Sequence, residues 1–200
     1  MLLNIPSLPD HSKLLLCCEF ASRKHALQKR KDGVTPYIVH PLGVAKLLVE
    51  SGVHDLATLQ AAVLHDLIED TDTTLEELNQ CFGKEVSDLV VECSDDKSLP
   101  KQVRKRLQIE HAPQVSFKAK NIKLADKLYN LRDLTQCVPK GWTPERVQEY
   151  FVWAKQVTDQ LKGTNHFLEM QLDSVYSTGE FTFEGKTYKA YPEHTESEKV

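Results

Sequence analysis

The stretch that decides the fold is residues 55–70, DLATLQAAVLHDLIED. It is nearly all apolar as far as Ile68, and a helix that is apolar all round is usually central to a fold. We therefore expect a buried helix from about Asp55 to Glu69. Its end carries four polar or charged groups, which are costly to bury unless something satisfies them. These groups are His65, Asp66, Glu69 and Asp70.

The end of this helix has the chemistry of a metal site. On a helix, His65 shares a face with Glu69, and Asp66 shares a face with Asp70, through i, i+4 spacing. Imidazole and carboxylate together suit a first-row cation such as Mn²⁺, Fe²⁺ or Zn²⁺. The alternative is a surface helix end with ordinary i, i+4 pairs. A bare His-Asp doublet does not decide between the two.

Two distant positions favour the metal site. His40 stands just before Pro41, which a helix tolerates only in its first turn, so His40 is expected to open a helix. Asp126 lies between Leu124 and Leu128, which mark a buried helical face. A helix bundle builds a metal site in its core from such residues on separate helices.

Over most of the chain, apolar residues recur with the spacing of an α-helix, which predicts an all-α bundle. Expected helices cover about 12–28, a segment from His40 to Gly52, a segment opened by the capping box Thr73–Glu76 and closed at Phe82–Gly83, then 84–93, 101–111, 116–135 and 144–161. Thr143 is the expected N-cap of the last of these, with Pro144 at its first position.

The tail differs from the rest. Residues 181–191 alternate aromatic and polar side chains around Glu184–Gly185, which predicts a small hairpin. A lone hairpin is marginally stable, so this one must dock on the helices or remain mobile. We expect a helical domain over 1–175 and a hairpin with a flexible tail over 176–200, disordered from Pro192 to Val200.

Composition narrows the class of protein. The net charge of −4 gives no reason to expect a nucleic-acid partner. The five cysteines include no C-x-x-C pair, which favours reduced thiols in a cytosolic protein. Met1–Ser12 does not read as a signal peptide, and no apolar stretch is long enough to span a membrane. We expect a cytoplasmic protein with a small-molecule substrate; the oligomeric state stays open.

The candidate residues resemble a known family. His40, His65-Asp66 and Asp126 are similar to the H…HD…D signature of the HD superfamily. The resemblance extends to the hydrolase domain of the bacterial RelA/SpoT enzymes, and most of all to the small metazoan members of that family, from about Leu14 to Glu169. The further matching motifs are Arg30-Lys31-Asp32, Thr35-Pro36-Tyr37, His40-Pro41, Glu69-Asp70-Thr71, and Lys123-Leu124-Ala125-Asp126-Lys127 with Asn130.

The resemblance implies an HD-type phosphohydrolase. That family uses Mn²⁺ to hydrolyse the 3′-diphosphate of the alarmone guanosine tetraphosphate (ppGpp), the nucleotide of the stringent or starvation response, to GDP and pyrophosphate. Two alternatives are an NADPH 2′-phosphatase, or broader nucleotide phosphatase, at the same metal, and a catalytically silent nucleotide sensor. The bacterial relatives add a synthetase and regulatory domains, for which this chain is too short.

The resemblance also implies roles for individual residues. It makes His40, His65, Asp66 and Asp126 the ligands of one metal ion, with Mn²⁺ expected and Fe²⁺ or Zn²⁺ as alternatives. It makes Glu69 and Asp70 the catalytic acidic pair; helix-end solvation and capping is the other interpretation. The substrate contacts that it implies are Arg30, Lys31, Asn130, Arg146 and Tyr150, and Lys101, in a second basic stretch after Leu99-Pro100, is a further expected contact. For Arg30 and Lys31 the alternative is a solvated basic loop, and for Arg146 and Tyr150 it is a cation–aromatic surface pair.

Overall fold

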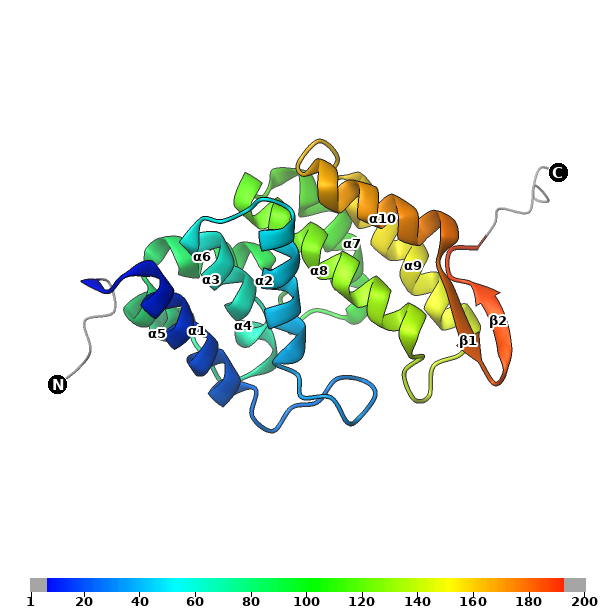
Figure 1. Ribbon diagram of the computed structural model, residues 1–200, viewed down its shortest axis with the longest axis horizontal. Helices are drawn as coiled ribbons and strands as arrows, with labels where there is room; N and C mark the ends of the chain where they lie inside the picture. Colours follow the sequence, from blue (N-terminus) through cyan, green and yellow to red (C-terminus); the bar gives the residue numbers. More distant parts are fainter. Residues whose placement is uncertain (1–6, 193–200) are drawn as a thin grey trace.

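The computed structural model describes residues 7–192. In chain order its elements are α1 (Asp10–Lys24), α2 (Val39–Glu50), α3 (Leu56–Leu64), α4 (Leu67–Asp70), α5 (Leu75–Phe82), α6 (Lys84–Cys93), α7 (Lys101–His111), a 3-10 turn (Ala112–Gln114), α8 (Phe117–Gln136), α9 (Pro144–Asp159), α10 (His166–Thr178), β1 (Glu180–Phe183) and β2 (Lys186–Lys189). The predicted helical fold with a small C-terminal hairpin is confirmed (Figure 1).

Two helices form the centre of the molecule. Every residue of α3 from Thr58 to Leu64 is buried, and α3 packs against α1, α2, α6 and α8. Helix α8 also packs against α2, α6, α9 and α10. Figure 1 shows α1 and α3 to α6 gathered at one end of the molecule and α9, α10 and the hairpin at the other, with α2 and α8 packed together between them. The candidate residues of α2, of the turn after α3 and of α8 are therefore brought to one place.

The continuous helix expected over Asp55–Glu69 is wrong at one point. Helix α3 ends at Leu64 and α4 begins at Leu67, with a turn at His65 and Asp66 between them. Nδ1 of His65 lies 2.7 Å from the carbonyl oxygen of Ala62. A continuing helix would offer that oxygen to the backbone N–H of Asp66, so the ring competes with the helical hydrogen bond. The i, i+4 relation is kept for Asp66 and Asp70, since the backbone N–H of Asp70 donates to the carbonyl oxygen of Asp66 at 2.8 Å.

Gly43 sets the distance between α2 and α8. A Cβ atom at Gly43 would lie 2.0 Å from Cε2 of Tyr129, closer than any real contact. The ring of Tyr129 therefore occupies the space that a side chain would take. One turn before Gly43, the ring of His40 lies 5.0 Å from the ring of Tyr129. The glycine allows the close approach that brings His40 to α8.

Helix starts were the most predictable feature. Thr74 caps α5 by accepting a hydrogen bond from the backbone N–H of Glu77 at 3.1 Å. Thr143 caps α9 in the same way, with Pro144 as its first residue. The first helix, expected over about 12–28, spans Asp10–Lys24, because the backbone turns at His25.

Helix α10 was not expected. Its signals are present in the sequence: Asn165 caps it by accepting from the backbone N–H of Leu168, and Leu168, Leu172 and Tyr176 recur every four residues on its buried side. Three apolar positions among polar neighbours make a weak periodic pattern.

The C-terminal hairpin docks on the helices. Strands β1 and β2 pair antiparallel, with Phe181 opposite Tyr188, and the turn at Glu184 and Gly185 has positive φ at both residues. Phe181 is 2% exposed and β1 packs against α8. Disorder was expected from Pro192 to Val200, of which residues 193–200 lie outside the described part of the chain. Of the stretch Met1–Ser12, which does not read as a signal peptide, residues 1–6 lie outside it as well.

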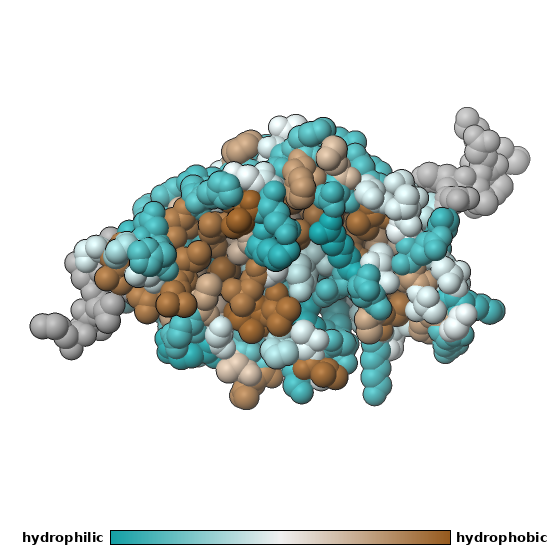
Figure 2. All heavy atoms as spheres, viewed as in Figure 1, coloured by the Kyte–Doolittle hydropathy of each residue, from teal (hydrophilic) through white to brown (hydrophobic). Residues whose placement is uncertain are grey.

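Within residues 7–192, no helix combines the length and the apolar character needed to cross a bilayer. Figure 2 shows apolar side chains gathered on one face over α1 and α2, whereas polar side chains cover most of the opposite end. Large exposed apolar residues of these two helices are Leu15, Val39, Leu42 and Val49.

Candidate active site

Two histidines and two aspartates from α2, the turn after α3, and α8 converge in the core. Nε2 of His40, at the start of α2, lies 3.4 Å from Oδ2 of Asp66 and 3.2 Å from Oδ1 of Asp126 in α8. Nε2 of His65 lies 3.2 Å from Oδ2 of Asp66 and 3.8 Å from Oδ1 of Asp126. The ligand atoms of His40, His65 and Asp126 all lie within 4.8 Å of one another. All four residues expected to bind a metal are thus brought together.

The ionisable residues of the cluster shift one another's pKa values. Burial by itself lowers the pKa of His65, but the carboxylates of Asp66 and Asp126 outweigh burial and raise that pKa to about 9. Burial would raise the pKa of Asp66, yet the neighbouring imidazoles hold it well below its usual value. Lys127 and the same histidines lower the pKa of Asp126. The carboxylates therefore stay ionised in the buried site.

A divalent cation fits this arrangement. Nε2 of His65 is buried and has no hydrogen-bond partner among residues 7–192. Because Nδ1 of the same ring lies 2.7 Å from the Ala62 carbonyl, Nδ1 would keep its proton, and a cation bound between the carboxylates would replace the proton that the raised pKa holds on Nε2. Two imidazoles and two carboxylates would also balance the charge of a dication. The donor set is one that first-row cations accept.

Neighbouring groups orient the carboxylates. The hydroxyl of Tyr37 donates to Oδ2 of Asp66 at 2.7 Å. The side-chain amide of Asn130 donates to Oδ1 of Asp126 at 2.7 Å, and Nζ of Lys127 lies 2.9 Å from the other oxygen of Asp126. Sequence reasoning assigned no role to Tyr37 or Lys127, although both stand inside the quoted motifs.

The two members of the acidic pair have different surroundings. Oε1 of Glu69 accepts a hydrogen bond of 2.7 Å from the backbone N–H of Asp95, and burial raises the pKa of Glu69 to about 7. The carboxylate of Asp70 pairs with the ammonium group of Lys97. Asp95 and Lys97 lie in the loop between α6 and α7. No local motif links that loop to α4, so sequence reasoning missed both.

One cavity joins the metal cluster to the acidic pair. It has a volume of about 320 Å³, and its lining includes the four clustered residues, Glu69 and Asp70. A second cavity of about 190 Å³ lies beside it. The two share one wall, formed by Arg30, Lys31, Asn130 and Tyr150. Four of the six expected substrate contacts therefore stand between the two cavities.

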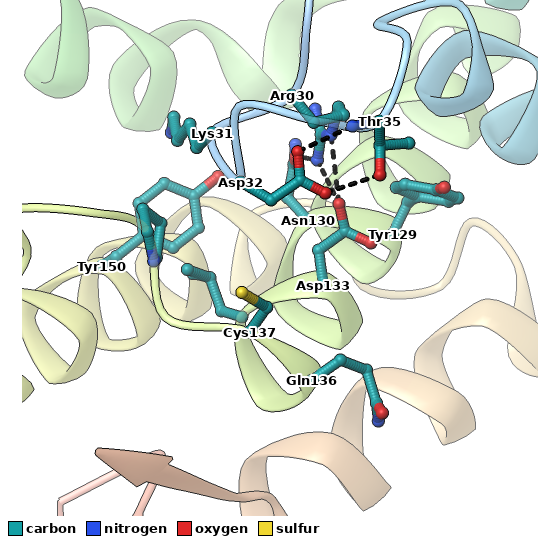
Figure 3. A pocket seen from close by; sticks show the side chains of 12 residues that line it. Arg30, Lys31, Asp32, Thr35, Tyr129, Asn130, Asp133, Gln136, Cys137 and Tyr150 are labelled. Carbon is teal, nitrogen blue, oxygen red and sulfur yellow. Dashed lines mark hydrogen bonds and ion pairs between the residues drawn. The ribbon is translucent and has the colours of Figure 1, made fainter. Parts of the chain in front are cut away.

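Arg30 is held firmly in that wall (Figure 3). Its guanidinium group donates to the carboxylate of Asp133 at 2.6 Å and to the side-chain oxygen of Asn130 at 2.9 Å. It also lies 5.7 Å from the ring centres of Tyr37 and Tyr129. Figure 3 shows Asp133, Tyr129 and Cys137 from α8 and its end facing the loop that carries Arg30 and Asp32. The loop is thereby fixed against α8.

The other two expected contacts stand at the edge of the site. Arg146 lies 4.4 Å from the ring centre of Trp142, and Nζ of Lys31 lies 4.8 Å from the same ring. Lys101 opens α7 and is exposed. Neither Arg146 nor Lys101 lines either cavity. Burial, Arg30, Lys101 and Arg146 together lower the pKa of Lys31, so these four cations make one positive region.

Comparison with known proteins places this arrangement in a family. The sequence pattern of the HD domain matches residues 17–154. The chain therefore belongs to the HD-domain family.

Within the HD-domain family, the chain is similar to a group of relatives that share one named activity. The chain is 57% identical over 169 residues to the guanosine-3′,5′-bis(diphosphate) 3′-pyrophosphohydrolases called MESH1 of Xenopus tropicalis and Homo sapiens; each alignment covers 84% of this chain and 94% of the relative. A solved structure of a metazoan orthologue of SpoT that hydrolyses ppGpp superposes with a TM-score of 0.81 at 52% identity, over 82% of this chain and 94% of that one. The expected family is confirmed.

Proposed function

We propose that the chain is a guanosine-3′,5′-bis(diphosphate) 3′-pyrophosphohydrolase that converts ppGpp and water to GDP and pyrophosphate. One observation carries the proposal. Relatives with that activity in their names align with this chain at 57% identity over 94% of their own length. The cluster and the two cavities supply the chemistry that such a reaction needs.

Mn²⁺ is the proposed cofactor, held as one ion by His40, His65, Asp66 and Asp126, with Fe²⁺ or Zn²⁺ as alternatives. The distances among the nitrogen and oxygen atoms of these residues support this assignment. When bound, such an ion supplies Lewis acidity to the attacked phosphoryl group and makes a neighbouring water more acidic.

Glu69 is the proposed proton acceptor from the attacking water. Its pKa of about 7 lies near the working pH, where a general base is most effective. The water oxygen forms a new bond to the phosphorus attached to the ribose 3′-oxygen, and the bond between that phosphorus and the 3′-oxygen breaks. Asp70, paired with Lys97, is the proposed partner that orients the water and helps to return a proton to the departing 3′-oxygen.

The substrate is proposed to bridge the two cavities. The 3′-diphosphate suits the cavity of the cluster, and the nucleoside suits the neighbouring cavity beyond the shared wall. Arg30 and Lys31 in that wall, with Lys101 and Arg146 at its edge, offer positive charge to the phosphates. Asn130 and Tyr150 offer polar contacts to the ribose between them. The negative overall charge of the chain is no obstacle, because the cations are local.

The same site would serve an NADPH 2′-phosphatase, which also breaks a phosphate ester of a ribose. A silent sensor would need no acidic pair beside the cluster, so the presence of Glu69 and Asp70 in the same cavity argues against it. The five unpaired cysteines further support our proposal that the protein acts in the cytosol.

The test is release of pyrophosphate from ppGpp, and of phosphate from NADPH, by the purified chain with Mn²⁺ and after chelation. We expect metal-dependent pyrophosphate release from ppGpp with the higher kcat/KM. Faster phosphate release from NADPH would overturn the substrate assignment. Tight binding of ppGpp without turnover would favour the sensor.

A further inference from the structure

A buried histidine outside the metal cluster has no assigned task. His25 follows the last residue of α1 and is 2% exposed. Nδ1 of its ring lies 2.6 Å from Oε1 of Gln28, whereas Nε2 has no hydrogen-bond partner in the described part of the chain. The centre of its ring lies 4.8 Å from the centre of the Tyr37 ring, with the two planes tilted by 38°. Burying an imidazole with one unpartnered nitrogen costs free energy. The hydrogen bond to Gln28 is therefore the polar contact that offsets this cost.

Gln28 continues from His25 to the acidic pair. Its side-chain amide donates a hydrogen bond to the backbone carbonyl of Asp70. Because the nitrogen of the amide is used there, its oxygen faces His25 and accepts from Nδ1. Asp70 is the last residue of the short α4, and its carbonyl has no acceptor role inside that helix. Gln28 therefore satisfies a helix end that carries a proposed catalytic residue.

Gln28 also begins the loop that carries the substrate cations. Its backbone oxygen accepts from the N–H of Tyr37 at 2.9 Å, which closes the loop holding Arg30 and Lys31. His25 and Gln28 thus link the end of α1, the start of the loop that carries Arg30 and Lys31, and the end of α4. Tyr37, packed on His25, in turn donates to Asp66.

We propose that His25 and Gln28 are positioning residues that hold the backbone of Asp70, and with it the acidic pair, at the cavity of the metal cluster. The proposal rests on the proposed function for its catalytic consequence. Neither side chain needs to touch the substrate; neither lines the cavity that holds Glu69 and Asp70. Arg30 is anchored separately by Asn130 and Asp133, so substrate binding should depend little on this pair.

The test compares His25→Leu, Gln28→Leu and His25→Asn. Asparagine places an amide nitrogen where Nδ1 of histidine stands, so it keeps the donor to Gln28. We expect the two leucine variants to lower kcat about 10- to 100-fold, as lost support of an active-site group does, with KM changed less than about 2-fold. His25→Asn should retain most of the wild-type kcat. Combined leucine substitutions should cost no more than either alone.

Thr158→Val is the matched control for general damage. Thr158 is buried in α9 and contacts the hydroxyl of Tyr176 at 3.1 Å, so its loss should lower Tm without changing kcat. An unchanged kcat in a folded leucine variant would overturn the proposal. So would an asparagine variant as slow as the leucine variant, because ring packing alone would then explain the effect. Gln28 is only half-buried, so Gln28→Leu remains informative should His25→Leu not fold.

Amide hydrogen exchange separates this proposal from the proposed function. The backbone of residues 66–71 should exchange faster in His25→Leu than in wild type, and His25→Asn should restore protection. This comparison needs no substrate. A wild-type chain that leaves ppGpp intact would end the proposed function, whereas the exchange data would still decide whether His25 and Gln28 hold the Asp70 backbone.

Discussion

The hydroxyl of Tyr37 donates a 2.7 Å hydrogen bond to Oδ2 of Asp66, the same oxygen that faces Nε2 of both His40 and His65. Tyr37 thereby fixes the direction of a proposed metal ligand without belonging to the cluster. Burial and the nearby Asp66 carboxylate raise the pKa of Tyr37 well above its usual value, so the phenol remains a donor at all working pH values.

Removing this donor should weaken metal binding. We expect Tyr37→Phe to lower the affinity for Mn²⁺ about 10- to 100-fold, since a partner that orients a ligand has an effect of this size. Calorimetric titration of the metal-free protein with Mn²⁺ measures it. Tyr188→Phe, in the hairpin, is the control and should bind as wild type does. Equal affinities in both variants would show that Asp66 needs no such support.

Glu69 should give the reaction its dependence on pH. Burial raises the pKa of this carboxyl to about 7. A proton acceptor works only when ionised, so kcat/KM should rise with pH through about 7 and level off above it. Glu69→Gln should slow the reaction about 10²- to 10⁴-fold and remove that rise. The pH–rate profile of both proteins measures this; a rise that survives in Glu69→Gln assigns it to another group.

The same carboxyl should affect stability in the metal-free protein. Between its unfolded pKa of about 4.3 and its folded pKa of about 7, the folded state binds more protons than the unfolded state. The free energy of unfolding therefore falls as pH rises across this window. Glu69→Gln removes that fall, so the variant should gain stability relative to wild type between pH 4.5 and pH 8. Urea unfolding at both values measures it, with no relative gain expected for Asp88→Asn on the surface.

Gly43 should be intolerant of a side chain. Alanine there would place a Cβ atom 2.0 Å from the ring of Tyr129, so α2 and α8 must separate or the ring must move. We expect Gly43→Ala to cost about 1–3 kcal/mol of stability. Because His40 and Asp126 lie on these two helices 3.2 Å apart, affinity for Mn²⁺ should fall as well.

Thermal unfolding and metal titration measure the two effects of Gly43→Ala. Lys46→Ala, on the exposed side of the same helix, should change neither. A variant with lower Tm but unchanged affinity would mean that the ring of Tyr129 yields while His40 stays in place.

Much of the fold could be predicted because helix starts depend on short-range chemistry. Thr74 and Thr143 each cap a helix by accepting a hydrogen bond from the backbone N–H three residues later. This spacing can be recognised in the amino-acid sequence. The turn at His65 could not be predicted in this way. It depends on a side chain that replaces a backbone donor, and periodicity does not record that choice.

In the candidate site, too, only the residues that stand in short motifs could be predicted from the sequence. His40, His65, Asp66 and Asp126 stand in short motifs, so they could be proposed before their distances were known. The residues that contact Glu69 and Asp70 come instead from segments that only the folded chain brings near. Asp95 and Lys97 reach the acidic pair from the loop after α6, and Gln28 reaches Asp70 from the end of α1. None of these three contacts leaves a pattern in the spacing of residues.

Asp66 provides the most direct test of the metal assignment. Its carboxylate faces both imidazoles of the cluster, so Asp66→Ala removes one proposed ligand and the negative charge that draws a cation into the core. A metal that binds only the folded state stabilises it by about 2.7 kcal/mol at 100 times its Kd. Wild-type protein should therefore show a Tm that rises with Mn²⁺ and falls back on chelation. In Asp66→Ala the rise should vanish together with turnover, whereas Asp88→Ala on the surface of α6 should behave as wild type does. A full Mn²⁺-dependent rise in Tm in Asp66→Ala would remove this residue from the site, because a retained metal would need no carboxylate there.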